Sequence, residues 1–418
     1  MPLDDSRAPA AAIWALGATQ ILGYGTLYYS FPILAPAMAA EFGVPEYWVF
    51  AALSAALFIG SLLAPTAGRL ADRHGAGVVM TVGSAAAGAA LAICALAPER
   101  WSFAAALVAM ELASCFVLYA TAFVAIVQIG AAGAARSITH LTLIAGFAST
   151  LFWPLTTFLH AVLDWREVYL IFAGVNLLIC LPIHAWLARL ARRRSARLAS
   201  VDATAEAIAA EGGAADPARE RLVFPLILAG FAITGFVLSA VLVHMVPLLT
   251  GLGLGTAGVL VSTFFGPSQV ASRLVNMVFG GRLRQTWLAA IAAGFLTAGL
   301  ILLVGTAPQV AGTAPQAAGI AAFVILFGLG SGLLSIVGGT LPLEVFGRKG
   351  YGARVGWTSA ARQFTSAFAP FAFSLMLAGT TTTGALSALS LAGLLGVAVF
   401  SAIAMLAKRP AGGTVHAG

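Results

Sequence analysis

Long apolar segments follow one another along nearly the whole chain, and they constrain the fold more than any other feature. A helix that crosses a bilayer needs about 20 mostly apolar residues. Charged residues and clusters of Gly, Pro and Thr divide this chain into twelve such segments. The predicted spans are 11–40, 47–68, 76–97, 102–129, 137–162, 168–188, 223–249, 256–280, 286–306, 316–343, 352–378 and 383–407. The sequence therefore predicts an all-α integral membrane protein with twelve transmembrane helices.

The composition also indicates that lipid is the main solvent of this chain. Hydrophobic residues make up 60% of the 418 residues and charged residues only 9%, whereas a soluble globular protein is about 25% charged. So few charges cannot cover a soluble protein of this size, which argues against a cytosolic enzyme, a disordered chain and a nucleic-acid-binding protein. We expect the lipid bilayer as a partner and no nucleic acid, despite the formal net charge of +7.

The basic residues are distributed unequally between the two sides of the predicted membrane. With both termini in the cytoplasm, eighteen Lys and Arg residues lie on the inner side and only Arg100 and Arg166 on the outer side. Cytoplasmic loops of membrane proteins carry such an excess. Arg greatly outnumbers Lys, and with the many Ala and Gly residues this suggests a GC-rich bacterial genome. We expect a multi-pass protein of a bacterial inner membrane with cytoplasmic termini.

One long polar segment separates the sixth span from the seventh. It divides the chain into an N-terminal six-helix bundle (1–188), a cytoplasmic linker (189–222) and a C-terminal six-helix bundle (223–418). Short sequence echoes recur at a spacing of about half the chain, such as Gly68-Arg69-Leu70 and Gly281-Arg282-Leu283. Transporters are often built from two such repeats. The sequence therefore predicts two pseudo-symmetric bundles.

The loop after the second span carries the most specific local motif, Gly68-Arg69-Leu70-Ala71-Asp72-Arg73-His74-Gly75. The glycines permit close approach and a tight turn, and Asp72 can face a helix N-terminus or pair with an arginine there. The loop resembles the G-x-x-x-D-R/K-x-G signature of the major facilitator superfamily, without its basic tail; the alternative is an ordinary basic turn. The resemblance implies the major facilitator fold and a conformational gate. That gate would consist of Gly68, Asp72, Arg73 and Gly75.

Three ionisable side chains lie inside predicted spans: Glu111, Arg273 and Arg362. A charge at the bilayer centre costs roughly 2.5–3.5 kcal/mol even on the milder scale, so such residues face the protein interior and are candidates for function. Arg273 shares a helical face with Gln269 and Asn276, and a guanidinium there can bind a carboxylate bidentately. We expect these residues and Arg362 to bind substrate. The alternatives are a structural Arg273 that bonds backbone carbonyls or Glu111, and an Arg362 that forms a gate or an interhelical contact.

The first span carries further candidate substrate contacts. Gln20, Tyr24 and Tyr28 recur on one helical face, which we expect to line the cavity, whereas Tyr29 falls on a different face. Tyrosine is also a common helix-packing residue, so packing is the alternative.

Glu111, His140 and His244 are candidates for proton coupling. Histidine titrates nearest to physiological pH, and a carboxyl group in an apolar cavity holds its proton more tightly unless an arginine pairs with it. The alternatives are a Glu111 that neutralises an arginine and a His244 that serves in packing.

The sequence predicts neither a metal site nor a cofactor. Cys94, Cys115 and Cys180 could form a soft metalloid site only if they converged. They lie on the third, fourth and sixth predicted spans, and the third and sixth are peripheral in the superfamily. The phosphate-binding loop G-x-x-x-x-G-K-[ST] is absent, so we expect no ATP hydrolysis.

Two groups within the superfamily resemble this chain most. The monocarboxylate porters and oxalate:formate antiporters place an arginine in the eighth span, as Arg273 stands here, and the latter also have a cation in the eleventh span, as Arg362 does. The chain departs from the porters at Gln269, where they commonly carry an acid. A weaker likeness to arsenite-efflux members rests on Gln269…Arg273 and on 150–154.

These observations predict a secondary active transporter rather than an enzyme. We expect a monomer that moves a small organic anion, a monocarboxylate or similar, by alternating access, with symport of protons or antiport equally open. Arg273 would hold the anion with help from Arg362. The alternative function is efflux of a toxic compound, such as arsenite, an organoarsenical or a drug. A membrane receptor or scaffold is the rival class, but it has no need to bury Arg273 and Glu111.

Overall fold

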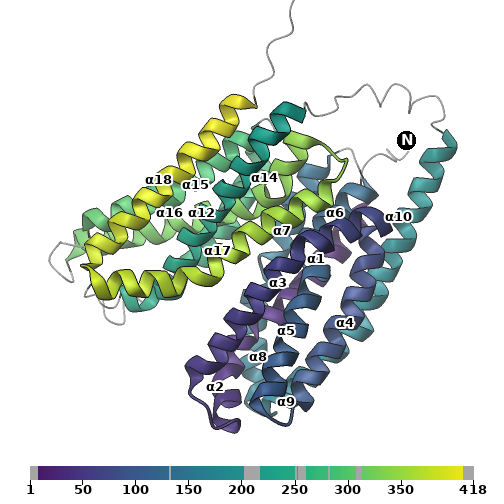
Figure 1. Ribbon diagram of the computed structural model, residues 1–418, viewed down its shortest axis with the longest axis horizontal. Coiled ribbons are helices and arrows are strands. Elements are labelled where there is room, and N and C mark those ends of the chain that lie inside the picture. The colour runs from purple at the N-terminus through teal and green to yellow at the C-terminus, as the bar shows by residue number, and fades with distance from the viewer. Residues whose placement is uncertain are drawn as a thin grey trace, which may run out of the picture.

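Helices make up all the regular secondary structure in residues 8–130, 133–201, 217–249, 252, 260–280, 283–306 and 313–407, which are the parts of the chain that the computed structural model describes. The helices form two bundles that meet where α1 (Ala10–Tyr24) begins and α18 (Thr382–Leu406) ends (Figure 1). We call this the termini side. The bundles diverge towards the opposite side, as the arms of a V.

The N-terminal bundle contains the first six spans, and four of these consist of more than one helix. In chain order its remaining elements are η1 (Gly25–Tyr29), α2 (Phe31–Glu41), α3 (Glu46–His74), α4 (Ala76–Leu96), α5 (Arg100–Val117), α6 (Tyr119–Ile129), α7 (Ala134–Ala145), α8 (Ala148–His160), α9 (Trp165–Val175), η2 (Asn176–Cys180) and α10 (Leu181–Val201). Broken helices are tolerated at membrane depth only where protein surrounds the freed backbone groups. The breaks therefore lie where protein or a water-filled cavity, rather than lipid, adjoins the backbone.

The C-terminal bundle contains the last six spans. Its elements before α18 are α12 (Pro217–Leu249), α14 (Phe265–Phe279), α15 (Gln285–Thr306), α16 (Ala314–Phe346) and α17 (Tyr351–Gly379). Helices α10 and α12 extend into the predicted linker from its two ends. The centre of that linker and the Gly281-Arg282 echo lie outside the described residues. The prediction of an all-α fold with twelve spans in two bundles is confirmed.

Among the described residues, nine helical segments are long and apolar enough to cross a membrane, judged by length and composition alone. The first, eighth and eleventh predicted spans are not among them. The first is divided by η1, the described part of the eighth is α14 with 15 residues, and the eleventh is α17, which carries Arg354 and Arg362. These three spans carry most of the candidate substrate contacts.

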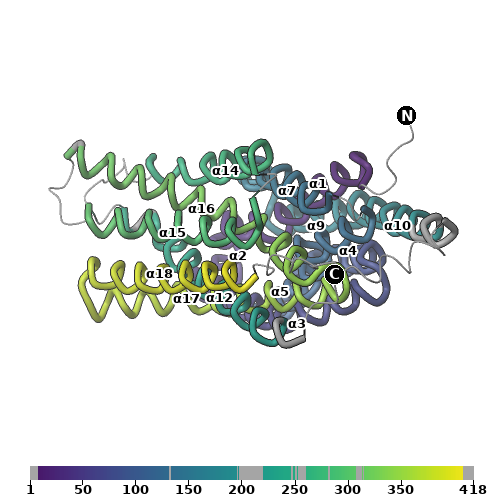
Figure 2. The backbone as a smooth tube through the Cα atoms, turned by 90° about the horizontal axis from the view of Figure 1, so that it is seen from above, coloured from purple at the N-terminus to yellow at the C-terminus, as the bar shows by residue number. Residues whose placement is uncertain are grey.

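Each bundle has an apolar core of its own, and Figure 2 shows the two bundles side by side. Fully buried aromatic residues fill the N-terminal core, namely Phe31, Phe103, Phe172, Trp165 and Tyr169. Those of the C-terminal core are Phe231, Phe323, Phe327, Phe373 and Phe400. Because close-packed cores resist deformation, each bundle can move as a unit.

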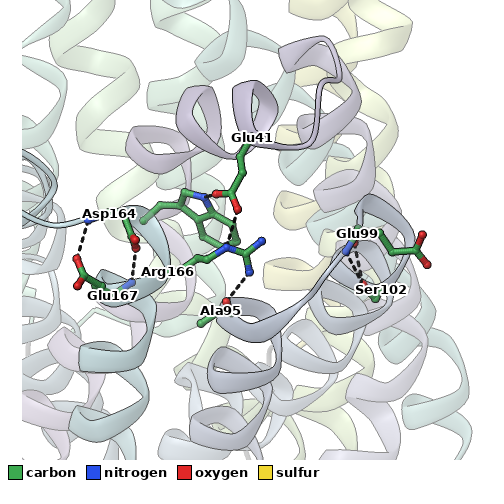
Figure 3. Close-up of polar contacts among 8 residues, drawn as sticks. Glu41, Ala95, Glu99, Ser102, Asp164, Arg166 and Glu167 are labelled. Atoms are coloured by element: carbon green, nitrogen blue, oxygen red, sulfur yellow. Dashed lines mark hydrogen bonds and ion pairs between the residues drawn. The ribbon is translucent and has the colours of Figure 1, made fainter.

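A polar clasp holds the N-terminal bundle together on the side opposite the termini (Figure 3). The Arg166 guanidinium donates from Nε to Glu41 at 2.7 Å and from Nη1 to the Ala95 carbonyl. The Trp165 indole N–H donates to the other carboxylate oxygen of Glu41. Asp164 caps α9 by accepting from the Glu167 N–H at 2.7 Å. These contacts join the ends of α2, α4 and α9 within one bundle.

The first seam between the bundles is formed by α3 and α17, which cross with their backbones in contact. A Cβ atom on Gly68 would lie 2.0 Å from the Gly352 carbonyl oxygen, and one on Gly356 would lie 2.5 Å from the Ala64 carbonyl oxygen. Real Cβ atoms do not approach so closely. Glycine at these positions is therefore what lets the two bundles meet on the termini side.

Asp72 closes the same seam with its charge. Its two carboxylate oxygens accept hydrogen bonds from the N–H groups of Gly352 at 2.8 Å and Ala353 at 2.9 Å. The first N–H groups of a helix lack partners within the helix and carry partial positive charge. Gly75 ends α3 with a φ of +88°, which glycine adopts without strain, whereas Arg73 is exposed.

The second seam lies between α7 and α14, and its centre is Arg273. The buried guanidinium donates to the Thr142 carbonyl of α7 at 3.0 Å, and within its own bundle to Gln269 at 3.2 Å and Ser335 at 3.1 Å. The Thr142 carbonyl also accepts the Gly146 N–H at 3.0 Å, and it lies in the last turn of α7, which carries partial negative charge. A Cβ on Gly146 would lie 2.3 Å from Nη1 of Arg273, so a glycine is needed beside the guanidinium.

We expect Gly68→Ala to open the termini side. Overpacking of this kind costs about 1–3 kcal/mol, which shifts a two-state equilibrium by about 5- to 150-fold. Spin labels on Arg73→Cys and Lys349→Cys, both exposed, report the separation of the bundles, and the long-distance population should grow. Gly174→Ala is the matched control, since a Cβ there meets nothing within 4 Å. An unchanged distance distribution for Gly68→Ala contradicts the seam.

We expect Gly146→Ala to displace the Arg273 guanidinium and to cost the hydrogen bond to Thr142. Hydrogen bonds to charged groups are worth about 1.5–3 kcal/mol, so thermal unfolding of the purified protein should occur at a lower temperature. In an Arg273→Ala background the same glycine substitution should have little further effect, because its target is gone. Additive effects of the two substitutions would refute the contact.

Candidate functional site

Arg362 is the cation that the structure leaves free between the bundles. Its stem packs on α12, where a Cβ on Gly235 would lie 2.7 Å from its Cγ atom. The side chain is exposed, and within the described parts of the chain its guanidinium has neither a hydrogen bond nor an ion pair. It nevertheless lies within electrostatic range of Tyr24, Tyr28 and Tyr119, which belong to the other bundle. Arg362 of the C-terminal bundle therefore lies near tyrosines of the N-terminal bundle.

Aromatic side chains of the first, fourth and fifth spans form a continuous cluster opposite Arg362. Ring centroids are 4.7 Å apart for Tyr24 and Tyr119, 6.2 Å for Tyr24 and Tyr29, 5.4 Å for Tyr28 and Tyr29, and 6.1 Å for Tyr29 and Trp153. We call these five residues the aromatic cluster.

A π-helical turn brings Tyr29 into the cluster. Regular α-helical spacing places Tyr29 on a different face from Tyr24 and Tyr28, as the sequence predicts. In η1, however, the Ser30 N–H bonds to the Gly25 carbonyl at 3.0 Å, five residues back. Such a turn inserts one residue into the helix, so residues five apart, Tyr24 and Tyr29, stand next to each other. The prediction that Tyr29 lies on a different face from Tyr24 and Tyr28 is therefore wrong, because it assumes a helix with an unbroken period of 3.6 residues.

A break in the fourth span places Tyr119. Helix α5 ends at Val117, Leu118 has extended backbone angles, and α6 begins at Tyr119. Gln20 is fully buried and donates from its amide nitrogen to the freed Val117 carbonyl at 2.7 Å. The structure thus places the predicted substrate contact Gln20 behind Tyr119, where it supports the break. Sequence reasoning misses Tyr119 because neither Gly nor Pro marks this break.

The two intramembrane arginines differ in their surroundings but converge on one residue. Tyr119 lies within electrostatic range of both Arg273 and Arg362, and Tyr29 within range of Arg273. Arg273 is only 6% exposed and its donors are engaged by protein oxygens. The geometry therefore presents one free guanidinium to the space between the bundles and one that is occupied in this conformation.

Glu111 is buried in α5, 5% exposed, beside the aromatic cluster. Its carboxylate accepts a hydrogen bond from the Ser114 hydroxyl at 3.3 Å and lies within electrostatic range of Tyr28. In the part of the chain that the structure describes, no Arg or Lys pairs with it. The alternative that Glu111 neutralises Arg273 is therefore not realised in this conformation.

The other predicted site residues lie apart from this centre. His140 lies one turn from Arg136 near the start of α7. His244 has both ring nitrogens engaged, with Nδ1 2.9 Å from the Ala240 carbonyl and Nε2 2.8 Å from the Ser374 hydroxyl. Asn276 is half-buried one turn beyond Arg273 and packs against Gly280, whereas Gln269 bonds Arg273 directly.

The cysteines do not form a cluster. Cys94 and Cys180 are buried in α4 and η2, and Cys115 donates to the Gly60 carbonyl at 3.3 Å. Among the described residues, no group of three or more His, Cys, Asp and Glu side chains is arranged to hold a metal ion.

The family model of the Major Facilitator Superfamily matches residues 16–370 of this chain. Similar solved structures include the human organic anion transporter MFSD10 (TETRAN), with a TM-score of 0.66, 14% sequence identity and coverage of 93% of this chain and 98% of that chain. The proton:xylose symporter XylE bound to 6-bromo-6-deoxy-D-glucose has a TM-score of 0.69 and 13% identity, with coverage of 94% and 96%. The transporter FucP in the outward conformation has a TM-score of 0.65 and 11% identity, with coverage of 95% and 99%.

No curated protein matches the sequence at a significant level, and the structural likenesses, all under 25% identity, show the fold alone. The family match spans far more than half of the chain and agrees with the twelve spans, the two bundles and the seams between them. By this match the chain belongs to the major facilitator superfamily, whose members are membrane transporters rather than enzymes.

Proposed function

We propose that this transporter moves a small organic anion, a monocarboxylate or similar, and that Arg362 binds its carboxylate. The observation that carries the proposal is the free guanidinium of Arg362, exposed between the bundles and opposite the tyrosines. A guanidinium offers a rigid fork of donors that matches a carboxylate, and a charged residue within a membrane span is a candidate for such a functional contact. The human neighbour is an organic anion transporter, but its low identity lends no weight to this choice.

Arg273 takes the second role in this proposal. The sequence favours it as the main ligand, but in this conformation its donors already bond Thr142, Gln269 and Ser335. A substrate that reached it would have to replace one of these partners. Arg273 therefore holds the second seam while the first anion contact forms at Arg362, and it completes the site only when that seam opens.

The distribution of basic residues favours the termini side as the cytoplasmic side of a bacterial inner membrane. Both seams lie towards that side, so this conformation faces outward. Alternating access would then separate α3 from α17 and α7 from α14, with residues 1–188 and 223–418 moving as bodies joined by the linker 189–222. The protein would act as a monomer, since the proposed binding site lies between the two halves of one chain.

Glu111 is the proposed proton carrier if transport is proton-coupled. It is buried beside the cluster and lacks a cationic partner among the described residues. A carboxyl group in that position can exchange a proton with the cavity when the bundles move. The rival is anion exchange, for which no proton carrier is needed. His140 and His244 are weaker candidates because they lie apart from Arg362.

We expect Arg362→Ala to abolish carboxylate uptake into proteoliposomes. Each hydrogen bond to the guanidinium is worth about 1.5–3 kcal/mol, so affinity should fall at least about tenfold, and Arg362→Lys should recover only part of it. Arg136→Ala, at an exposed arginine, is the control. The same vesicles are assayed with labelled arsenite. Arsenite transport without carboxylate transport would overturn the proposal in favour of efflux of a toxic compound.

We expect Glu111→Gln to uncouple transport from the proton gradient. Gradient-driven accumulation of the anion should be lost, while exchange of internal for external anion continues, because the amide keeps the shape but cannot carry a proton. Glu46→Gln, at an exposed acid, should behave as the wild type. Retention of gradient-driven accumulation in Glu111→Gln would exclude this residue as the carrier.

A further inference from the structure

The aromatic cluster presents ring faces to the same space as the free arginine. Tyr28 is 45% exposed and its ring packs against Tyr29, with ring centroids 5.4 Å apart, which places it at the exposed edge of the aromatic cluster, towards the other bundle. Its electrostatic interaction with Arg362 of the other bundle supports this placement. An exposed aromatic face in this position is accessible to a ligand.

Trp153 extends this surface on the fifth span. It is 53% exposed, and its ring meets Tyr29 edge-on. Trp153 therefore extends the exposed edge of the aromatic cluster onto α8.

The guanidinium of Arg362 and the exposed aromatic rings together favour one class of ligand. The guanidinium of Arg362 demands an anion, and the exposed rings of Tyr28 and Trp153 favour a planar π-system, since aromatic pairs gain energy beyond the area that they bury. A short aliphatic acid would pair with the Arg362 guanidinium but would leave both aromatic rings exposed to water. A saturated ring would bury similar area but would lack the face and edge interactions of an aromatic one.

We propose that the substrate is an aryl carboxylate, a planar aromatic ring that bears one carboxylate, with the carboxylate on Arg362 and the ring against Tyr28 and Trp153. The proposal rests on the proposed function, because it assumes the anion contact at Arg362. It adds a specificity surface that is built by the first and fifth spans. No covalent step is involved, and the ligand leaves unchanged.

The test compares benzoate with cyclohexanecarboxylate, which has the same carbon skeleton size but no π-system, and with acetate. Binding to the purified full-length protein is measured by calorimetry, and uptake is measured in proteoliposomes. We expect benzoate to bind about tenfold more tightly than cyclohexanecarboxylate, and acetate to bind most weakly. Trp153→Leu should reduce the preference for benzoate to about threefold or less, whereas Trp153→Phe, which keeps a ring, should retain most of it.

Trp14→Leu is the matched control, since Trp14 is 65% exposed on α1, and it should leave the preference unchanged. Equal binding of benzoate and cyclohexanecarboxylate would overturn the aryl preference while the anion function stands. A preference that survives Trp153→Leu undiminished would overturn the placement of the ring. Failure of all three carboxylates to bind would overturn the anion function itself, and with it the aryl carboxylate.

Discussion

Charged side chains that cap the helix ends of the opposite bundle set the conformation on which the rest of the structure depends. Asp72 of the N-terminal bundle accepts from the first N–H groups of α17, and Arg273 of the C-terminal bundle donates to the last turn of α7. The negative charge of Asp72 meets the positive N-terminal end of a helix, and the positive charge of Arg273 meets the negative C-terminal end of another, so both contacts are favourable. Each supplies the partner that a desolvated charge requires. Both must break before the termini side can open.

These seams are suited to reversal because they rely on polar contacts and close backbone approach. The glycines of α3 and α17 bring backbone carbonyl groups into contact on the termini side, and further along the same seam Phe58 of α3 packs against Phe364 and Phe368 of α17. The fully buried aromatic side chains, in contrast, are concentrated within the separate cores. Two states of one protein interconvert only if they differ by a few kcal/mol. A few hydrogen bonds to charged groups supply that scale of energy. The apolar cluster that Tyr351 and Val355 share with the N-terminal bundle adds to it, but a shared core as large as those within the bundles would fix one state.

The sequence predicts the spans well but the centre of the molecule poorly, for a physical reason. Apolar length is set by the bilayer, so twelve spans and two bundles can be recognised without contacts. The position of Tyr29 depends on the π-turn at Gly25–Tyr29, and that of Tyr119 on the break at Leu118. Both Arg273 and Arg362 stand out in the sequence, yet the contact of Arg273 with the Thr142 carbonyl depends on how α7 packs against α14, which the sequence does not reveal.

The position of the free arginine also connects binding to movement. Arg362 belongs to the C-terminal bundle and the aromatic cluster to the N-terminal bundle, so a ligand that touches both has an affinity that depends on their separation. A ligand that binds two conformational states with equal affinity does not change their relative populations. A ligand clamped between bundles favours whichever state brings Arg362 and the rings together. Tyr119, within electrostatic range of both arginines, lies where a charge on the ligand would also be felt by Arg273, the residue that holds the second seam.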